Sequence, residues 1–167
     1  NYRYLNNTNI NGSCPGRTKP RYLGSPGNYY SVSYDWHGSD TVSSWNNAMA
    51  NNYKAGDIDT SGNEGCSRGV DCSGFVSRVW GVSRYGTCGL EDISTQLSST
   101  SNLLRGDIMN KCSTTPRHTI LFSSFASNGM NGYESTTANQ YDRVVSIYHS
   151  WSSLSNYVPR RYNNVCP

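Results

Sequence analysis

The sequence predicts an α+β fold, with helices in the first half of the chain and antiparallel strands in the second. Two segments, 40–55 and the one beginning at Cys72, carry apolar residues at the spacings of three and four that a helix requires. From Arg117 the spacing changes to the period of two of a half-buried strand. Helices followed by antiparallel strands are typical of the α+β class. A chain of 167 residues has the length of one typical domain.

The composition excludes several classes of function. Only 15% of the residues are charged, against about 25% in an average globular protein. The net charge of +3 comes from scattered Lys and Arg, so the basic patch of a nucleic-acid-binding protein is missing. No apolar run approaches the ~20 residues of a membrane-spanning helix. The thirteen tyrosines instead suit a surface that meets polar ligands such as peptides or carbohydrates.

The cysteines predict an oxidising compartment. The chain has six, in a polar sequence without a basic-then-apolar leader, which favours a mature secreted product or an excised domain located outside the cell or in the cell wall. A structural zinc site needs ligand pairs two to four residues apart, whereas the closest pair, Cys66 and Cys72, is six apart. We therefore expect disulfides, and neither a metal nor another cofactor.

The first elements are an arm and a helix. Residues 1–33 contain three well-spaced prolines among many Asn and Gly, which predicts a loop-rich N-terminal arm ahead of a domain over 34–167. In 40–55 the helical stripe consists of Val42, Trp45, Met49 and Tyr53. Next, Asp57, Asp59 and Ser61 resemble the first half of a calcium loop, but Arg68 occupies the place of the closing Glu. A calcium site and an Asx-rich turn both stay open.

The remaining elements begin with the helix at Cys72, for which Asp71 is the expected N-cap. Its apolar face consists of Phe75, Val76, Val79 and Trp80, and a short amphipathic stretch follows over 90–97. The expected strands cover 117–125, 132–136, 144–148 and 157–162, with a hairpin turn at Asn128-Gly129. Pro159 cannot donate to a ladder, so we expect the last strand at a sheet edge.

One cysteine is placed for chemistry. Cys72 lies in the first turn of its helix, where unpaired backbone N–H groups and the helix dipole favour a thiolate. His118 heads the alternating strand and could act as its general base, with Glu134 on the returning strand orienting the imidazole. The competing interpretation is that Cys72 is half of a disulfide. His37 and His149 lack such a pattern and are interpreted as surface or packing residues.

Three segments resemble the NlpC family of papain-like cell-wall cysteine peptidases. They are 71–76 (DCSGFV), 104–108 (LRGDI) and 118–122 (HTILF), in the order and spacing of that family. The resemblance covers about 34–160. It implies helices packed on a small antiparallel sheet, with Cys72 as nucleophile and His118 as base.

The resemblance also implies further site residues. The family's third catalytic residue is a polar side chain on the strand after the histidine strand, for which Glu134 is the candidate. Asp71 and Ser73 match positions that hold the free amine of the substrate. Residues 34–38 (YDWHG) look like the family's Tyr-x-Trp-Gly-Gly, whose Tyr, here Tyr34, lines the cleft and donates to the oxyanion. His37 replaces the first Gly, and the segment between Gly38 and Asp71 is longer than is usual in the family.

With Cys72 as the nucleophile, five cysteines remain for two disulfides. We expect Cys14 to pair with Cys166 and Cys88 with Cys112, which leaves Cys66 as a thiol that could bond Cys72 and inactivate the enzyme. Because five candidates allow fifteen arrangements, the sequence does not rank them.

The expected function is that of a secreted, monomeric cysteine endopeptidase that hydrolyses amide bonds in peptidoglycan stem peptides through a thioester. A related amidase or acyltransferase is the second hypothesis, because one fold hosts several chemistries. The third is a catalytically silent, disulfide-stapled module that binds glycans through Tyr and Trp. Peptidoglycan peptide is the expected partner, and an inhibitor protein is a further partner that the sequence leaves open.

Overall fold

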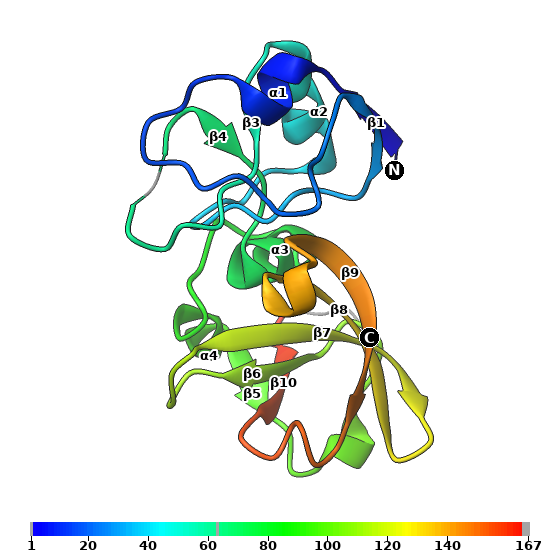
Figure 1. Ribbon diagram of the computed structural model, residues 1–167. Coiled ribbons are helices and arrows are strands. Elements are labelled where there is room, and N and C mark those ends of the chain that lie inside the picture. The colour runs from blue at the N-terminus through cyan, green and yellow to red at the C-terminus, as the bar shows by residue number, and fades with distance from the viewer. Residues whose placement is uncertain (1, 63, 165–167) are drawn as a thin grey trace. The chain divides into compact units, whose positions relative to one another are not determined.

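The computed structural model describes residues 2–62 and 64–164 and has an α+β fold (Figure 1). The chain divides into two compact units, the first formed by Asn1–Phe75 with Ser135–Val145 and the second by Val76–Glu134 with Ser146–Pro167. Three elements, α3 (Cys72–Val79), β8 (Gly129–Thr136) and β9 (Arg143–Ser150), run from one unit into the other. Each unit has its own hydrophobic core.

The start of the first unit is more regular than predicted. Within the expected arm, β1 (Tyr2–Leu5) pairs antiparallel with β2 (Gly27–Tyr30), and α1 (Asn7–Asn11) follows β1. Asn6 and Asn9 form a reciprocal capping box, each side chain accepting the other's backbone N–H at 2.9 Å. The helix forms because it ends before the first proline, at Pro15, so the proline spacing never interrupts it.

The predicted helix over 40–55 is present but shorter, as α2 (Val42–Ala50). Thr41 caps it by accepting the Ser44 N–H at 3.0 Å. Trp45 and Met49 are buried in the core as the stripe predicts, whereas Val42 is exposed and Tyr53 lies beyond the end of the helix. The helix stops at Asn51 because Asn52 adopts a positive φ of 62°, which turns the chain into β3 (Lys54–Ala55). Strand β3 pairs parallel with β4 (Ser67–Arg68).

The core of the first unit is assembled from α1, α2 and the segments around them. Its buried residues are Leu5, Ile10, Leu23, Val32, Trp45, Ala48, Met49, Ala55 and Val70. Phe75, from the second turn of α3, packs against this cluster. The core therefore holds the start of α3, and with it the helix end that carries Cys72, within the first unit.

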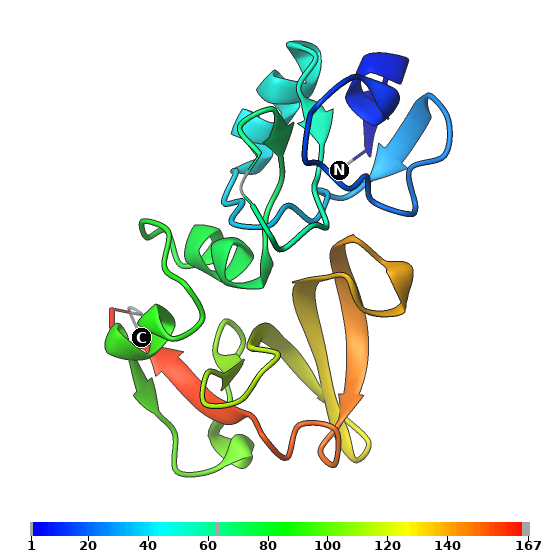
Figure 2. The ribbon, with the colours of Figure 1, turned by 60° about the vertical axis from the view of Figure 1, so that its left-hand side comes forward.

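Six antiparallel strands form one sheet in the order β5-β10-β6-β7-β8-β9. The strands not yet located are β5 (Ser94–Gln96), β6 (Ile108–Lys111), β7 (His118–Ala126) and β10 (Val158–Tyr162) (Figure 2). The expected hairpin joins β7 to β8, but its turn is Ser127-Asn128, because Gly129 already pairs with Ala126. Asn128 has φ 58°, a left-handed conformation that Asn tolerates in turns.

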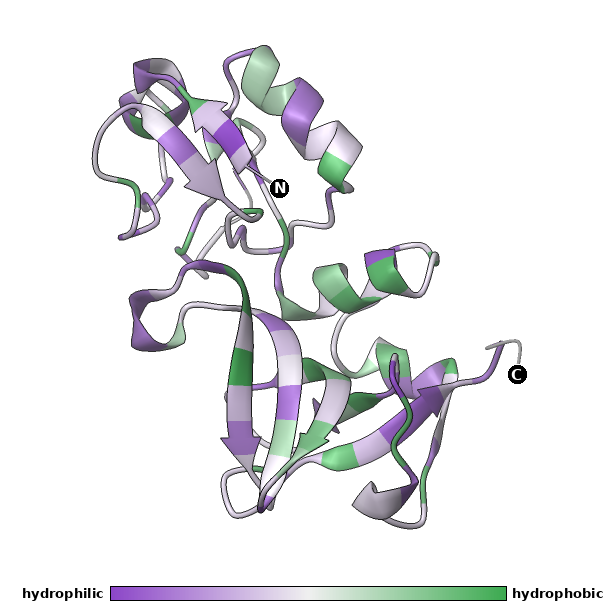
Figure 3. Ribbon diagram, turned by 90° about the vertical axis from the view of Figure 1, so that its right-hand side faces the viewer, coloured by the Kyte–Doolittle hydropathy of each residue, from purple (hydrophilic) through white to green (hydrophobic). Residues whose placement is uncertain are grey.

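The alternation in β7 places its core-facing side chains as predicted, but the strand is buried on both faces from Thr119 to Phe122 and not half-buried. Ile120 and Phe122 are buried with Met109, Met130 and Leu154 in the second core, to which Leu103 also belongs. The strands of the sheet carry both hydrophobic and hydrophilic residues (Figure 3). The predicted amphipathic stretch over 90–97 divides into α4 (Gly89–Asp92) and β5.

The prediction that the proline-containing strand lies at an edge is wrong. β10 is an inner strand, hydrogen-bonded to both β5 and β6. Arg160 pairs with Gln96, the last residue of β5, so Pro159 lies just past the end of that short strand, where its carbonyl accepts the Leu97 N–H at 2.9 Å. A residue's N and O point to the same side of a strand, so the missing N–H falls beyond β5 and leaves the β6 ladder intact.

Candidate functional site

Cys72 is the first residue of α3, and Asp71 caps that helix as predicted. The Asp71 carboxylate accepts the Gly74 N–H at 2.6 Å and the Ser73 hydroxyl at 2.9 Å. Asp71 therefore satisfies one of the N–H groups that the first turn leaves without a helical partner. Cys72 is buried and belongs to neither disulfide.

The start of α3 is held against the segment that contains the Tyr-x-Trp-x-Gly motif. The Gly38 carbonyl accepts the Asp71 N–H at 3.0 Å. A Cβ atom on Gly74 would lie 2.0 Å from that same carbonyl oxygen, and one on Gly38 would lie 2.5 Å from the Gly69 carbonyl oxygen. Both positions need glycine because backbone approaches backbone there. These contacts fix the position of the first turn of α3, and with it the position of Cys72, relative to the motif segment.

The first two residues of the motif segment, Tyr34 and Asp35, are buried in the first unit. Tyr34 forms a parallel bridge with Val70, donates its N–H to the Asp142 carbonyl at 2.8 Å, and is 7% exposed. His37 has φ 62°, the left-handed conformation in which glycine is favoured. The residue that departs from the glycine pattern thus keeps the backbone shape that glycine would adopt.

Asp35, within the same motif, is a buried acid that sequence reasoning did not single out. Burial raises the pKa of Asp35 to about 7, although a hydrogen bond from Ser67 acts to lower it. Its Oδ1 atom has no hydrogen-bond partner. The signal in the sequence was an Asp between two aromatic residues, but such a pattern does not reveal which carboxylates become buried.

In the second unit, His118 and Glu134 are brought together. The register pairs Leu121 with Tyr133, and its continuation places Glu134 opposite Ile120, two residues from His118 on the same face of the sheet. Diagonal neighbours of this kind are within reach of long side chains. His118 Nε2 and Glu134 Oε2 form a hydrogen bond, which is also an ion pair when the imidazole is protonated.

A second histidine, which sequence reasoning assigned to surface or packing, also contacts this carboxylate. His149 Nε2 lies 2.9 Å from Glu134 Oε1. This contact is an ion pair when the His149 ring is protonated. Burial by itself would raise the pKa of Glu134, but the interactions with His118 and His149 outweigh burial and lower it to about 2. Glu134 is therefore a carboxylate at neutral pH.

The disulfides differ in part from the expected set. Cys88 pairs with Cys112 as predicted, but Cys14 pairs with Cys66, so the expected Cys14–Cys166 bond is wrong, and so are the predicted Cys66 thiol and its bond to Cys72. Cys166 lies outside the described residues.

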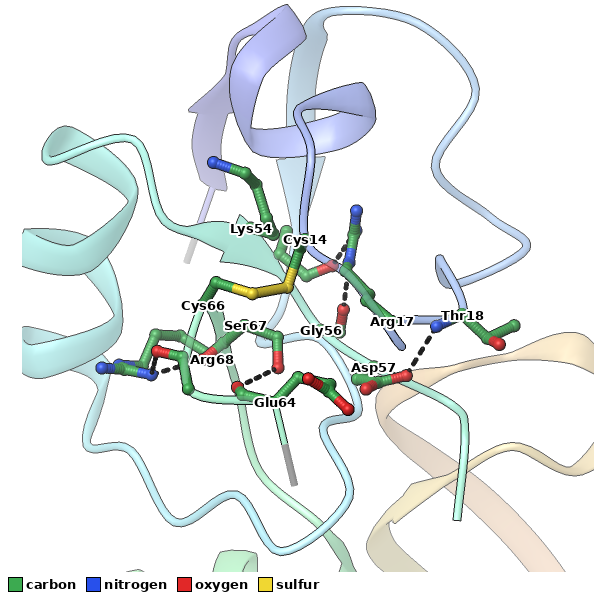
Figure 4. Close-up of a disulfide and its surroundings, with 12 residues drawn as sticks. Cys14, Arg17, Thr18, Lys54, Gly56, Asp57, Glu64, Cys66, Ser67 and Arg68 are labelled. Carbon is green, nitrogen blue, oxygen red and sulfur yellow. Dashed lines mark hydrogen bonds between the residues drawn. A yellow bond between two sulfur atoms is a disulfide. The ribbon is translucent and has the colours of Figure 1, made fainter. Parts of the chain in front are cut away.

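The pairing of Cys14 with Cys66 follows from contacts on both sides of the bridge, which Figure 4 shows. The Cys66 carbonyl accepts the Lys54 N–H at 3.0 Å, which places Cys66 beside β3. Near Cys14, Arg17 donates to the carbonyls of Ala55 and Gly56, at 2.8 and 2.7 Å. Both cysteines are thus held against the same short segment.

The Asp-rich segment forms turns. Asp57 Oδ1 accepts the N–H groups of Thr18 and Asp59, each at 2.9 Å, and Asp59 Oδ1 accepts the Ser61 N–H at 2.8 Å. These are Asx turns, the second of the two interpretations that the sequence left open. In residues 2–62 and 64–164, no group of three or more His, Cys, Asp or Glu is arranged to hold a metal ion.

The predicted site residues thus fall into two sets. Tyr34, Asp71, Cys72 and Ser73 belong to the first unit, and His118 and Glu134 to the second. No helix in the described part of the chain is long and apolar enough to cross a membrane. The two disulfides are consistent with an oxidising compartment. In comparisons with known proteins, no family model matches the sequence and no curated protein gives a significant match.

Proposed function

We propose that this protein is a secreted cysteine endopeptidase that hydrolyses amide bonds in the stem peptides of peptidoglycan. The observation that carries the proposal is the hydrogen bond between His118 and Glu134, which orients a strand histidine and would stabilise the positive charge of its imidazole after it accepts a thiol proton. Cys72 supplies the matching thiol, since it lies at a capped helix N-terminus and in neither disulfide. The proposal assigns these three residues to a papain-like, NlpC-type site.

The proposed reaction has two steps. His118 takes the proton of Cys72, the thiolate sulfur attacks the carbonyl carbon of the amide, and a tetrahedral oxyanion forms. The backbone N–H of Cys72 and the Tyr34 hydroxyl are the proposed donors to that oxyanion. The protonated His118 then gives its proton to the leaving amine as the C–N bond breaks. Water adds to the resulting thioester, releases the carboxylic acid and restores the thiol.

The charge of Glu134 supports this assignment. A carboxylate with a pKa of about 2 stays ionised throughout the cycle and stabilises the imidazolium that His118 becomes after it accepts the thiol proton. Asp71 and Ser73 are the proposed contacts for the free amine of the substrate. Because Asp71 also caps α3, its replacement would disturb both substrate binding and the position of Cys72.

The left-handed backbone at His37 also supports the NlpC-type assignment. The family pattern has glycine at this position, and a residue with φ 62° keeps the loop in the shape that glycine allows. The close approach of Gly74 to the Gly38 carbonyl ties that loop to the helix of Cys72. The motif and the nucleophile helix therefore behave as one unit of structure.

The test is hydrolysis of purified sacculi and of defined muropeptides by the wild type and by Cys72→Ser and His118→Ala. Both variants should lose at least about a hundredfold in rate, because removing the nucleophile or the base removes the covalent route. Tyr148→Phe, which removes only a hydroxyl bonded to the carbonyls of Ser127 and Asn128, is the matched control and should keep the rate. Full activity of Cys72→Ser would contradict the proposal.

The products and the thiol chemistry distinguish the related enzymes. Release of a peptide from the sugar, rather than a cut within the peptide, would indicate the amidase. Iodoacetamide labelling of Cys72 should stay fast well below pH 8 and slow in His118→Ala, because in the proposed mechanism His118 accepts the thiol proton. Slow labelling that follows an ordinary thiol pKa in both proteins would argue against an activated pair.

A glycan-binding module is a second candidate, favoured by the aromatic face of the β1–β2 hairpin. Tyr2, Tyr4 and Tyr30 are 78%, 58% and 56% exposed, and the rings of Tyr2 and Tyr30 lie 5.3 Å apart. Tyr2 pairs with Tyr30 across the ladder, and Tyr4 is two residues along, so all three share one face. Exposed rings of this kind stack on sugars. Binding to sacculi without any turnover, abolished by Tyr2→Ala with Tyr30→Ala, would favour this function.

A further inference from the structure

Glu134 is contacted by a ring nitrogen from each of its two neighbouring strands. In the sheet order, β8 lies between β7 and β9. His118 on β7 contacts Oε2 of Glu134, and His149 on β9 lies 2.9 Å from Oε1. The three side chains therefore form a His–Glu–His row within the second unit.

This row restricts the carboxylate. Both of its oxygens are engaged, so rotation of the carboxyl group breaks at least one contact. The Glu134 side chain is only 5% exposed, and a buried carboxylate oxygen without a partner is costly. With His118 alone, the second oxygen would have to find another donor, and the group would turn toward it.

We propose that His149 is a positioning residue, which holds Oε1 of Glu134 so that Oε2 stays directed at His118. The inference rests on the proposed function, because it assigns His149 a part in the same site. His149 itself does not touch the reacting atoms in this scheme. It acts through Glu134 on the imidazole that exchanges the proton.

The next observation concerns the charged side chains near this row. Among the described residues, those whose interactions lower the pKa of Glu134 are His118 from β7 and His149 from β9. On the next strand, β6, Lys111 pairs with His118, and its ammonium lies over the ring of Tyr157, 5.2 Å from the ring centre. Both histidines lower the pKa of Glu134, so loss of His149 should raise it.

The test measures the titration of Glu134 directly. The chain has three glutamates, Glu64, Glu91 and Glu134, so carboxyl-labelled glutamate gives three carbon resonances, and Glu134→Gln identifies the one of interest. Titrations of the wild type, His149→Phe and His149→Gln are compared with Tyr148→Phe, the neighbour on β9. His149→Asn, which is too short to reach the carboxylate, replaces His149→Phe if that variant does not fold.

We expect His149→Phe to raise the pKa of Glu134 by about one unit. In muropeptide hydrolysis the same variant should lower kcat about tenfold and leave KM unchanged, because the contact acts on the chemical step. His149→Gln keeps an N–H donor on a side chain of similar length and should recover most of both losses. Tyr148→Phe should match the wild type in both measurements.

Two results would overturn the inference: an unchanged Glu134 pKa in His149→Phe, or a raised pKa with unchanged kcat. A different result separates it from the proposed function. The wild type could cleave no muropeptide while His149→Phe still raises the pKa of Glu134 and His149→Gln restores it. That outcome would support the positioning of the carboxylate by His149 and contradict the proposed hydrolase function.

Discussion

Removing the Cys14–Cys66 disulfide should destabilise the first unit by about 4 kcal/mol. The bridge joins residues 52 apart, and the loop-entropy relation for a loop of that length gives about 4 kcal/mol at 25 °C. The closed loop contains most of the first core, including Leu23, Trp45 and Met49. The proposed perturbation is the double variant Cys14→Ala with Cys66→Ala, which removes both thiols and so prevents exchange with Cys72.

The assay is amide hydrogen exchange read peptide by peptide under native conditions, which reports the stability of each unit separately. Protection in α2 should fall by the equivalent of about 4 kcal/mol, while β6 and β7 should change little. The matched control, Cys88→Ala with Cys112→Ala, opens a loop of 24 residues, should cost about 3.5 kcal/mol, and should act on the second unit. Loss of less than 1 kcal/mol in α2, or a nonreduced peptide map without a Cys14–Cys66 peptide, would refute the reasoning.

Two further predictions concern the start of α3 and the buried carboxylate. Gly74→Ala should destabilise the first unit by roughly 1–3 kcal/mol in urea unfolding, because its Cβ would lie 2.0 Å from the Gly38 carbonyl oxygen. The control Gly86→Ala has open space around the new methyl group and should be neutral. Equal effects of the two substitutions would contradict the packing argument. Glu134 has a pKa of about 2, lowered from 4.5, so its stabilising contribution is complete above pH 4.5 and is lost as the pH falls toward 2. Glu134→Gln should flatten the pH dependence of the unfolding free energy in that range, and an unchanged slope would argue against the ion pairs.

Features that depend on near neighbours in the chain were predictable. The cap by Asp71 follows from one side chain bonding an N–H three residues later. The strand at His118 follows from its period of two, because alternation places Ile120 and Phe122 on the same face. The approach of Glu134 to His118 could be anticipated for a similar reason, since a tight hairpin leaves few possible registers.

Features that join distant segments were not predictable in the same way. The pairing of Cys14 with Cys66 depends on where β3 and the chain near Arg17 meet, and no spacing in the sequence encodes that meeting. The inner position of β10 is possible because β5 ends opposite Arg160. No residue of β5 therefore lies opposite Pro159, where the backbone N–H is missing. Both are properties of the partner strand and not of the segment itself.

The sequence by itself determined the α+β class, the capped helix that begins at Cys72, and the hairpin that carries His118 and Glu134, because each follows from interactions within a few residues or across one tight turn. Only the tertiary structure decided which cysteines pair and that His149 reaches the carboxylate of Glu134. His149 is fifteen residues further along the chain and on another strand, so its contact depends on how β8 and β9 align. Such alignment is set by the packing of the whole sheet, and for that reason the contact could not be predicted from a single histidine.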